Sequence, residues 1–205
     1  KISKKSNVVS WFFAAIATAR TMEEGGLIQA EGRDDDDDEM FVYVGGDQFV
    51  PDDVVRVRIA KSVKIIPTRA FQGRRRLIYV EFHDGLEIIR EFAFYGCTSL
   101  RSIKLLGVKV IEEGAFCDCG GLKEIEFGDE LETIKEGAFQ CCTSLRTVKM
   151  PSVKAIGRYA FGSCRQLTDL DLPEGLETIE QFAFNCCQSL RRIAVPLKSD
   201  MIEDD

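Results

Sequence analysis

The sequence predicts an α/β-type repeat solenoid, a stack of short parallel strands joined by turns or short helical returns, mostly strand and loop. The dipeptide Ala-Phe recurs six times after residue 50, and its Phe residues are 23, 22, 23, 22 and 23 residues apart. Apolar residues stand at fixed distances from every one of these Phe residues. A unit of this length is too short to enclose its own core, so successive units must bury their apolar side chains against one another.

Positions within a repeat are numbered here from its Phe, so that +6 is the residue six places later. Position −5 is Ile in every repeat and position +6 is Leu; position +9 is Val, Ile or Leu, and position +11 is Phe, Leu, Met or Val. The segment from +6 to +11 predicts a short strand that turns its spaced apolar side chains inward. The Ala-Phe segment predicts the returning turn, where a small Ala allows close approach and the Phe fills the interior. Stacking at about 4.8 Å per coil then gives a parallel solenoid.

The stack is expected to begin with an N-terminal cap over about residues 40–59 and to continue as six repeats over about residues 60–200 of a solenoid spanning 40–205. Val54, Val57 and Ile59 repeat the strand spacing one period early. Residues 40–50, with Gly45-Gly46-Asp47 as a turn, predict a short hairpin that covers the edge of the first coil. A seventh Phe would fall at about residue 206 or 207, so we expect the stack to be truncated at residue 205.

Residues 1–39 differ from the repeats and predict an apolar segment followed by an acidic, disordered linker. Lys residues precede an apolar run over residues 8–19 that ends in Ala17-Thr18-Ala19, which has the shape of a secretory signal. The same run also fits a short amphipathic helix. Residues 34–39 are six consecutive carboxylates, which repel one another and favour a solvated, flexible linker.

The repeats resemble the BspA-type leucine-rich repeat, whose pattern is Ile-x-x-x-Ala-Phe-x-x-Cys-x-x-Leu-x-x-Ile-x-Leu-Pro. The match is clearest over residues 156–173 and extends over about residues 52–200. The stretch over residues 43–51 is similar to the one that precedes such repeats in expanded protein sets of unicellular algae. This resemblance implies a right-handed leucine-rich-repeat stack that is used for protein interaction and carries no catalytic motif. The first repeat departs from the pattern, because Arg74 stands where Cys is expected.

Five of the eight cysteines form one column at position +3. A residue that recurs with the repeat belongs to the packing, so this column predicts a structural ladder of small buried side chains. The ladder is Cys97, Cys119, Cys142, Cys164 and Cys187. Cys117, Cys141 and Cys186 lie off the column and are expected to be more exposed. The alternative use of these thiols is metal binding or redox chemistry, although they lack zinc-ligand spacing.

Two columns of charged residues alternate in sign from coil to coil. Position +10 reads Glu81, Lys104, Glu126, Lys149, Asp171 and Ala194, and position −7 reads Lys64, Glu87, Lys109, Glu132, Lys154 and Glu177. Neighbours in the stack would then present opposite charges, which favours the correct register of the coils. Each such exposed pair is worth about 0.2–1 kcal/mol.

The column at position +7 is mainly basic and is predicted to lie on the strand face, the usual interaction surface of leucine-rich repeats. It reads Ile78, Arg101, Lys123, Arg146, Thr168 and Arg191. The candidate binding residues on this face are Tyr79, Arg101, Lys104, Lys123, Glu124, Arg146, Lys149, Asp169, Arg191 and Arg192. A partner with an acidic or mixed ridge would fit them. The alternative is a solvated face whose charges are balanced by adjacent carboxylates.

Composition and motifs exclude several classes of function. The net charge of −7 is a poor match for nucleic acid. No apolar stretch reaches the roughly 20 residues that a membrane-spanning helix needs. The single histidine, His83, precedes Asp84 in a predicted loop and has no nucleophile partner in the repeat. No phosphate-binding loop or nucleophile motif is present, so we expect no catalytic residue, no metal and no cofactor. Gly120, Gly121 and Gly162 fall in predicted turns, where left-handed backbone is expected.

The sequence therefore predicts a non-catalytic protein-interaction module, a scaffold or recognition domain that binds a protein partner on its strand face. A secreted or cell-surface adhesion protein is the alternative if residues 1–39 contain a signal. A thiol-based metal- or redox-responsive protein is the second alternative. The absence of Asn-x-Ser/Thr sites and Cys-x-x-Cys pairs favours an intracellular location, and a signal would mean secretion. Neither the identity of the partner nor the oligomeric state follows from the sequence.

Overall fold

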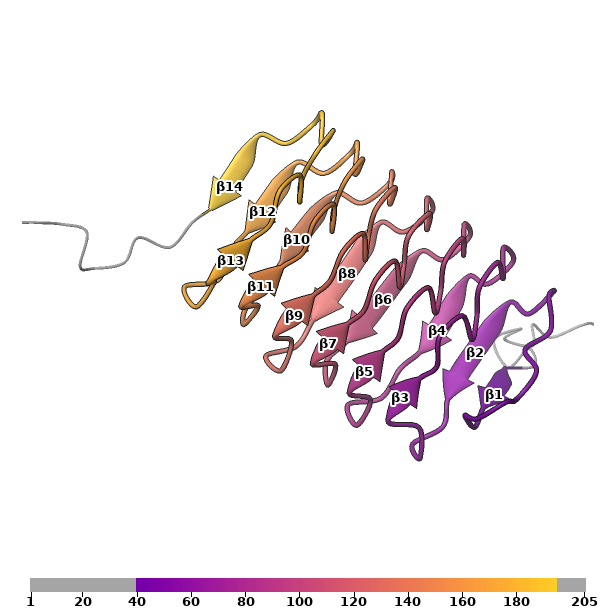
Figure 1. The fold of residues 1–205 in the computed structure, drawn as a ribbon. Coiled ribbons are helices and arrows are strands. Elements are labelled where there is room, and N and C mark those ends of the chain that lie inside the picture. The colour runs from indigo at the N-terminus through magenta and orange to yellow at the C-terminus, as the bar shows by residue number, and fades with distance from the viewer. Residues whose placement is uncertain (1–39, 195–205) are drawn as a thin grey trace, which may run out of the picture. The chain divides into compact units, whose positions relative to one another are not determined.

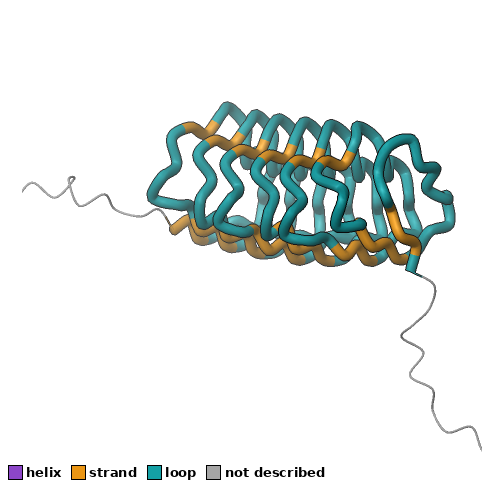
Figure 2. The backbone as a smooth tube through the Cα atoms, turned by 90° about the horizontal axis from the view of Figure 1, so that it is seen from below, coloured by secondary structure: helices purple, strands orange, loops and turns teal. Residues whose placement is uncertain are grey.

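The computed structural model describes residues 40–194, which form a parallel β-solenoid with two sheets along its length (Figures 1 and 2). Sheet A has eight strands in the order β1-β2-β4-β6-β8-β10-β12-β14, and sheet B has six in the order β13-β11-β9-β7-β5-β3. All strand pairs are parallel. The predicted solenoid is thus confirmed. Residues 1–39, with their predicted signal and acidic linker, and residues 195–205 lie outside the described part.

In the six repeats, the strands of sheet A fall at positions +8 to +11, within the predicted +6 to +11 segments; its second strand lies one period earlier, as expected, and its first strand precedes that. The strands of sheet A are β1 (Phe41–Tyr43), β2 (Arg56–Ile59), β4 (Tyr79–Glu81), β6 (Ser102–Leu105), β8 (Glu124–Phe127), β10 (Thr147–Lys149), β12 (Asp169–Asp171) and β14 (Arg192–Ala194). Sheet B adds a second, two-residue strand per coil at the Ile of position −5, which the sequence analysis treated only as an apolar column. Its strands are β3 (Ile65–Ile66), β5 (Ile88–Ile89), β7 (Val110–Ile111), β9 (Thr133–Ile134), β11 (Ala155–Ile156) and β13 (Thr178–Ile179).

The Ala-Phe segments return the chain by turns, and none of the described residues is helical. The alternative of short helical returns is therefore wrong for this part of the chain. In line with this, the described residues contain no helix long and apolar enough to cross a membrane. The returns are nevertheless regular, because they form a third ladder of hydrogen bonds between coils, outside both sheets.

The Ala-Phe pair builds this third ladder. The backbone N–H of each Phe from Phe71 to Phe161 donates to the carbonyl of the Ala in the next coil, at 2.7–2.8 Å. The Phe rings stack nearly parallel, with centroids 4.7 Å apart for Phe71 and Phe94 and 5.3 Å apart for Phe116 and Phe139. Five of these rings are fully buried, and buried Ala residues beside them let the backbones approach. Burial of a Phe side chain contributes about 1.5–3 kcal/mol, so this column is a large part of the core.

Left-handed backbone occurs at two positions in every repeat, −2 and +2. These residues are Arg69, Phe92, Gly114, Gly137, Tyr159 and Phe182 at −2, and Gly73, Gly96, Asp118, Cys141, Ser163 and Cys186 at +2. Their geometry directs the N–H groups of positions −2, 0 and +2 at carbonyls of the next coil, as Arg69 N–H to Glu91 and Gly73 N–H to Tyr95 illustrate. Eight of the twelve are not Gly, so the inter-coil bonds offset the usual steric cost of this conformation.

The expectation of left-handed backbone at Gly120, Gly121 and Gly162 is wrong, because none of them has a positive φ. Gly121 serves a different purpose, since a Cβ atom there would lie 2.4 Å from the carbonyl oxygen of Thr98. Close approach between coils, rather than turn geometry, therefore requires this Gly. The sequence shows the small residue but not the neighbouring carbonyl that demands it.

The expected hairpin over residues 40–50 is also wrong. Strand β1 pairs in parallel with β2, with Phe41 opposite Val57 and Tyr43 opposite Ile59. The buried Tyr43 ring packs edge-on against Phe71, 4.9 Å away, so β1 extends the repeat spacing by one more coil. The Gln48 side chain covers the outer edge of β1, where its Oε1 accepts from Val44 N–H at 2.7 Å and its Nε2 donates to the Val42 carbonyl at 3.1 Å. These bonds satisfy backbone groups at an edge where another strand could otherwise pair.

The predicted cysteine ladder is confirmed. Cys97, Cys119, Cys142 and Cys164 are fully buried and Cys187 is partly buried. Each thiol donates to the carbonyl of the Phe in the preceding coil, at 3.1–3.3 Å. Arg74, which replaces the first Cys, reaches back in the same way, and its Nε and Nη2 donate to the Val50 carbonyl at 3.0 and 2.7 Å. Position +3 is therefore an inter-coil donor as well as a small filler.

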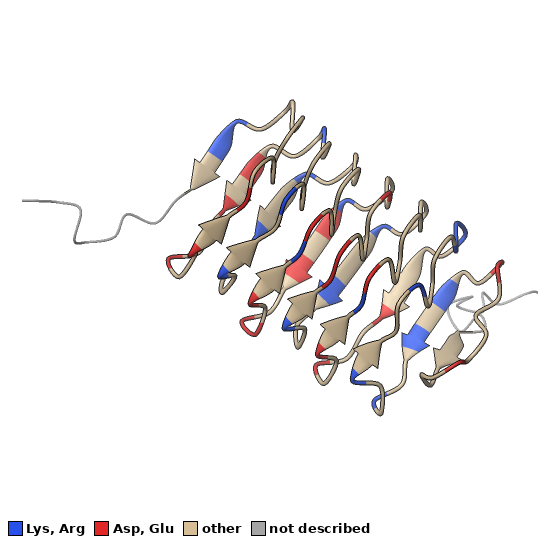
Figure 3. Ribbon diagram, viewed as in Figure 1, with Lys and Arg blue, Asp and Glu red and all other residues tan. Residues whose placement is uncertain are grey.

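Ion pairs between coils confirm part of the predicted charge alternation. Figure 3 shows the positions of the basic and acidic residues along the ribbon. At position −7, Glu87 lies 3.2 Å from Lys64 and 3.8 Å from Lys109, and Glu132 lies 2.8 Å from Lys154. Hydrogen bonds from Lys64 and Lys154 lower the pKa values of Glu87 and Glu132, respectively. A lowered folded-state pKa means that the stabilisation is present at neutral pH and is lost as acid protonates the carboxylates.

Substitution of Gly107 by Ala tests the closeness of the coils. A Cβ atom at Gly107 would lie 1.7 Å from the Asp84 carbonyl oxygen, whereas one at Gly175 would meet no atom within 4 Å. We expect Gly107→Ala to lower the free energy of unfolding by at least about 2 kcal/mol, and Gly175→Ala to change it by less than about 0.5 kcal/mol. Urea denaturation followed by circular dichroism measures both. Equal effects of the two substitutions would contradict the tight packing at Gly107.

Thiol labelling tests the ladder. Burial raises the pKa of Cys97 to about 12, and burial also raises the pKa values of Cys119 and Cys142 well above the ordinary range. Since the thiolate is the reactive form, we expect Cys97, Cys119, Cys142 and Cys164 to resist a thiol reagent in the folded protein and all eight cysteines to react after unfolding. Reaction of more than four thiols in the folded state would show that the ladder is not buried.

Candidate protein-interaction face

The outer face of sheet A carries the charged and polar side chains that face away from the core. Within each strand, the side chains at positions +8 and +10 are exposed or half-buried, while those at +9 and +11 point inward. This alternation follows from the period of two in a β-strand. Parallel pairing then places equivalent residues of successive coils side by side, so each position becomes a column along the solenoid.

All ten predicted binding residues lie on this face or at its edge. Tyr79, Lys104, Glu124, Lys149, Asp169 and Arg192 lie in the strands β4, β6, β8, β10, β12 and β14. Arg101, Lys123, Arg146 and Arg191 each immediately precede a strand, and all four are exposed. We call these four cations the basic column. No ion pair between described residues involves a member of the basic column.

The backbone sets the spacing of the basic column. Lys123 N–H donates to the Arg101 carbonyl at 2.8 Å, and Arg146 N–H donates to the Lys123 carbonyl at 3.4 Å. Thr168 interrupts the column before Arg191, and its hydroxyl lies 2.6 Å from an Asp169 carboxylate oxygen. Arg101, Lys123 and Arg146 therefore form the continuous part of the column, across β6, β8 and β10.

Charges at position +10 are already partly neutralised. Lys104 Nζ lies 2.8 Å from Glu126 Oε2, and Arg58 Nε lies 2.9 Å from Glu81 Oε2. The hydrogen bond to Glu126 raises the pKa of Lys104. Lys149, in the next coil, is exposed and belongs to no ion pair between the residues described. Of the +10 cations on the repeats, Lys149 is thus the one available to a partner.

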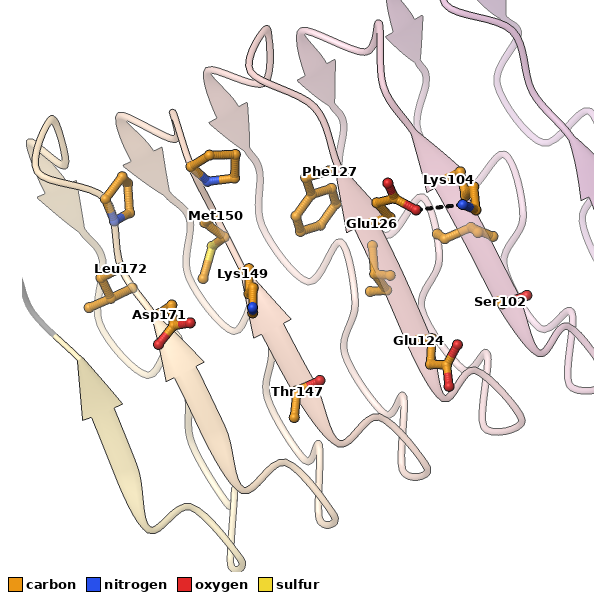
Figure 4. A pocket seen from close by; sticks show the side chains of 14 residues that line it. Ser102, Lys104, Glu124, Glu126, Phe127, Thr147, Lys149, Met150, Asp171 and Leu172 are labelled. Atoms are coloured by element: carbon orange, nitrogen blue, oxygen red, sulfur yellow. Dashed lines mark ion pairs between the residues drawn. The ribbon is translucent and has the colours of Figure 1, made fainter.

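Sheet A opens between β8 and β10, and a groove of about 610 Å³ lies there (Figure 4). Strands β6 and β8 pair over four residues and β10 and β12 over three, whereas β8 and β10 pair only through Glu124 and Thr147. Strands β4 and β6 likewise pair only through Tyr79 and Ser102. The groove is lined by Ser102, Ile103, Lys104, Glu124, Ile125, Glu126, Phe127, Thr147, Lys149, Met150, Pro151, Asp171, Leu172 and Pro173. Three of the predicted binding residues, Lys104, Glu124 and Lys149, are among them.

The groove was not predicted from the sequence, because Ile125 was expected in the core and is only half-buried, whereas Phe127, Met150 and Leu172 are buried as expected. Steps of 23 residues were the available signal: those from β4 to β6 and from β8 to β10 keep a single paired residue, but those from β2 to β4 and from β12 to β14 keep three. Repeat length alone therefore does not locate the opening.

The described residues do not form the metal or histidine sites that the sequence could have suggested. No group of three or more His, Cys, Asp or Glu side chains in residues 40–194 could hold a metal ion. His83 has a structural role, since its Nδ1 accepts from Gly85 N–H at 3.1 Å and its Nε2 donates to the Val63 carbonyl at 3.1 Å. Of the three cysteines off the ladder, Cys186 is exposed and Cys117 and Cys141 are half-buried, so all three are more accessible than the four buried ladder thiols but only Cys186 is fully exposed.

Comparisons with known proteins support the fold assignment. The family model described as the BspA type leucine-rich repeat region, present in six copies, matches residues 44–165 and 106–205. A leucine-rich repeat protein of T. pallidum is 35% identical with a TM-score of 0.54, and the match covers 58% of each chain. One from Eubacterium ventriosum is 26% identical with a TM-score of 0.64, and the match covers 68% of this chain and 38% of that one.

This chain thus matches 58% and 38% of the lengths of these two relatives. A comparison with curated protein sequences gave no significant match. The family model covers most of the chain, and the strands from β2 to β14 lie within the residues that it matches. The chain belongs to the BspA-type leucine-rich repeat family.

Proposed function

We propose that this chain is a non-catalytic interaction module that binds a protein partner on the outer face of sheet A. Leucine-rich repeats are generally protein-interaction or surface-recognition modules, which supports the class of function. The observation that carries the location is the groove between β8 and β10, an apolar opening bordered by charged side chains on a rigid sheet. Apolar pockets with a few placed polar groups are the usual form of a binding site.

The rigidity of the face favours binding. Inter-coil hydrogen bonds at sheet A, sheet B and the Ala-Phe turns hold each coil on three sides. The partner therefore meets a preformed surface, and the protein loses little conformational entropy on association. Four exposed cations in the basic column would steer an acidic or mixed partner surface and contribute to specificity.

The thiol-based alternative has less support. Burial is the main cause that raises the pKa of Cys117 to about 12, and burial also raises the pKa of Cys141. Thiols with raised pKa values carry little thiolate at neutral pH and react slowly. A secreted or cell-surface role depends on residues 1–39, which lie outside the described residues, and it is compatible with the same binding face.

Charge reversal of the basic column tests the proposed function. We expect Arg101→Glu/Arg146→Glu/Arg191→Glu to reduce the recovery of specific partners from a native extract of the source cells by at least about tenfold, because it replaces steering cations with anions. Quantitative mass spectrometry of affinity-purified complexes measures the change, with the unmodified chain processed in parallel.

Arg75→Glu/Arg90→Glu/Arg165→Glu is the matched control. It changes the net charge by the same amount at three exposed Arg residues that lie outside the strands of sheet A. We expect this variant to recover the same partners as the unmodified chain. Equal recovery by all three proteins, each with an unchanged circular dichroism spectrum, would refute binding through the basic column.

A further inference from the structure

The groove lies at one of two thinly paired steps of sheet A, since β8 and β10 share a single residue pair, as do β4 and β6. Inter-coil hydrogen bonds at position +7 are 2.8 Å long on either side of it, from Lys123 to Arg101 and from Thr168 to Arg146, but 3.4 Å across it, from Arg146 to Lys123. The bond from Arg101 to Ile78, between the coils of β4 and β6, is also 3.4 Å long. Beyond Glu124 and Thr147 the two strands no longer pair. The coils therefore stay in register at the start of the strands and separate towards their ends.

Ile125 is more accessible in the groove than its equivalents in the neighbouring coils. At position +9, Val80, Ile103, Val148 and Leu170 are 0–4% exposed, whereas Ile125 is only half-buried. Ile125 is thus the one central member of its column that reaches the surface. Phe127 and Leu172, at position +11, retain 7% and 9% exposure and complete an apolar floor. An apolar floor of this kind is an anchor site for a large apolar side chain.

Charges of both signs border the floor, since Lys104, Lys149, Glu124, Glu126 and Asp171 all line the groove. Lys104 and Glu126 are paired with each other on one side, as Figure 4 shows. Lys149 borders the floor as a cation outside the ion pairs of the described residues, and Arg146 of the basic column stands at the start of the same strand. From Arg146 to Met150 the chain advances four residues, about 13 Å in a strand. A carboxylate two to four residues from an anchor seated in the groove would therefore reach Arg146.

We propose that the groove binds an extended segment of the partner that carries one large apolar side chain, seated over Ile125 and Phe127, and a carboxylate two to four residues away that pairs with Arg146. This inference rests on the proposed function and specifies its recognition chemistry. The volume of about 610 Å³ lies within the range of about 300–1,000 Å³ that is typical of ligand pockets, so it accommodates the anchor and its flanking backbone.

The probe for this site is a phage-displayed library of random 12-residue peptides, panned against the full chain. We expect enrichment of peptides with a Leu, Met or Phe and an Asp or Glu two to four residues from it. Fluorescence anisotropy of the labelled consensus peptide then measures its Kd. Replacement of the anchor by Ser is expected to weaken binding at least about tenfold, because it removes the apolar contact with the floor.

Variants of the protein locate the contact. Ile125→Asp is expected to raise the Kd of the consensus peptide at least tenfold, and Ile125→Val is expected to raise it less than threefold. Because Ile125→Asp could also unfold the chain, Arg146→Glu provides an independent test at an exposed residue. The Arg146→Glu variant is expected to bind the consensus peptide about tenfold more weakly than the unmodified chain does. It is expected to bind the peptide whose carboxylate is replaced by Lys more tightly than the unmodified chain does. Arg165→Glu, away from the groove, is the control and leaves both affinities unchanged.

Each outcome decides the proposal. Peptides that bind regardless of Ile125 and Arg146, or a library that yields no binder, overturn it. In either case, the proposed function is tested separately by the triple variant of the basic column. If that variant still recovers fewer partners from the extract, the partner binds the charged face without using the groove, and the proposed function stands. Sedimentation velocity tests whether a second copy of this chain occupies the groove instead. If the chain self-associates and Ile125→Asp converts it to a monomer, a second copy fills the groove, which also overturns the proposal.

Discussion

The hydrogen bond from each Phe N–H to the Ala carbonyl of the next coil sets the register on which the rest of the solenoid depends. It is 2.7–2.8 Å long at every step from Phe71 to Phe161, and it brings the Phe rings into a continuous stack in the core. Short bonds of this kind leave no room for a coil to slip. The Ala at position −1 is small because a larger side chain would hold the two backbones apart.

Three ladders of inter-coil hydrogen bonds hold the coils together. Sheets A and B supply two, and the Ala-Phe turns supply the third through left-handed residues at −2 and +2. The thiols of the cysteine ladder add a bond from each coil to the preceding one, and Arg74 takes over this role where the column begins. Buried polar groups of the turns are thus paired without any helix, which explains how so short a repeat can close.

Stiffness at the turns permits a break on the opposite side. The Phe stack and sheet B continue without interruption past β8 and β10, with Ala155 opposite Thr133 and Ile156 opposite Ile134 in sheet B. Sheet A can therefore open there without separating the coils. The +10 column shows the same division, since its ion pairs form within the well-paired strands β2–β4 and β6–β8. The groove lies where the hydrogen bonds of sheet A are sparse while those of sheet B and the Ala-Phe turns continue.

The sequence by itself determined the repeat, the number of coils that carry Ala-Phe, the inward columns and the buried cysteine ladder, because each depends on a residue type that recurs at a constant spacing. It also identified the charged columns of the strand face. Only the tertiary structure decided that β1 is a parallel strand rather than half of a hairpin, that Gln48 caps its edge, and that Ile125 surfaces between β8 and β10. These features depend on how far neighbouring coils approach or separate. That distance is set jointly by hydrogen bonds and packing contributed from adjacent repeats, and no single repeat encodes it in its own residues.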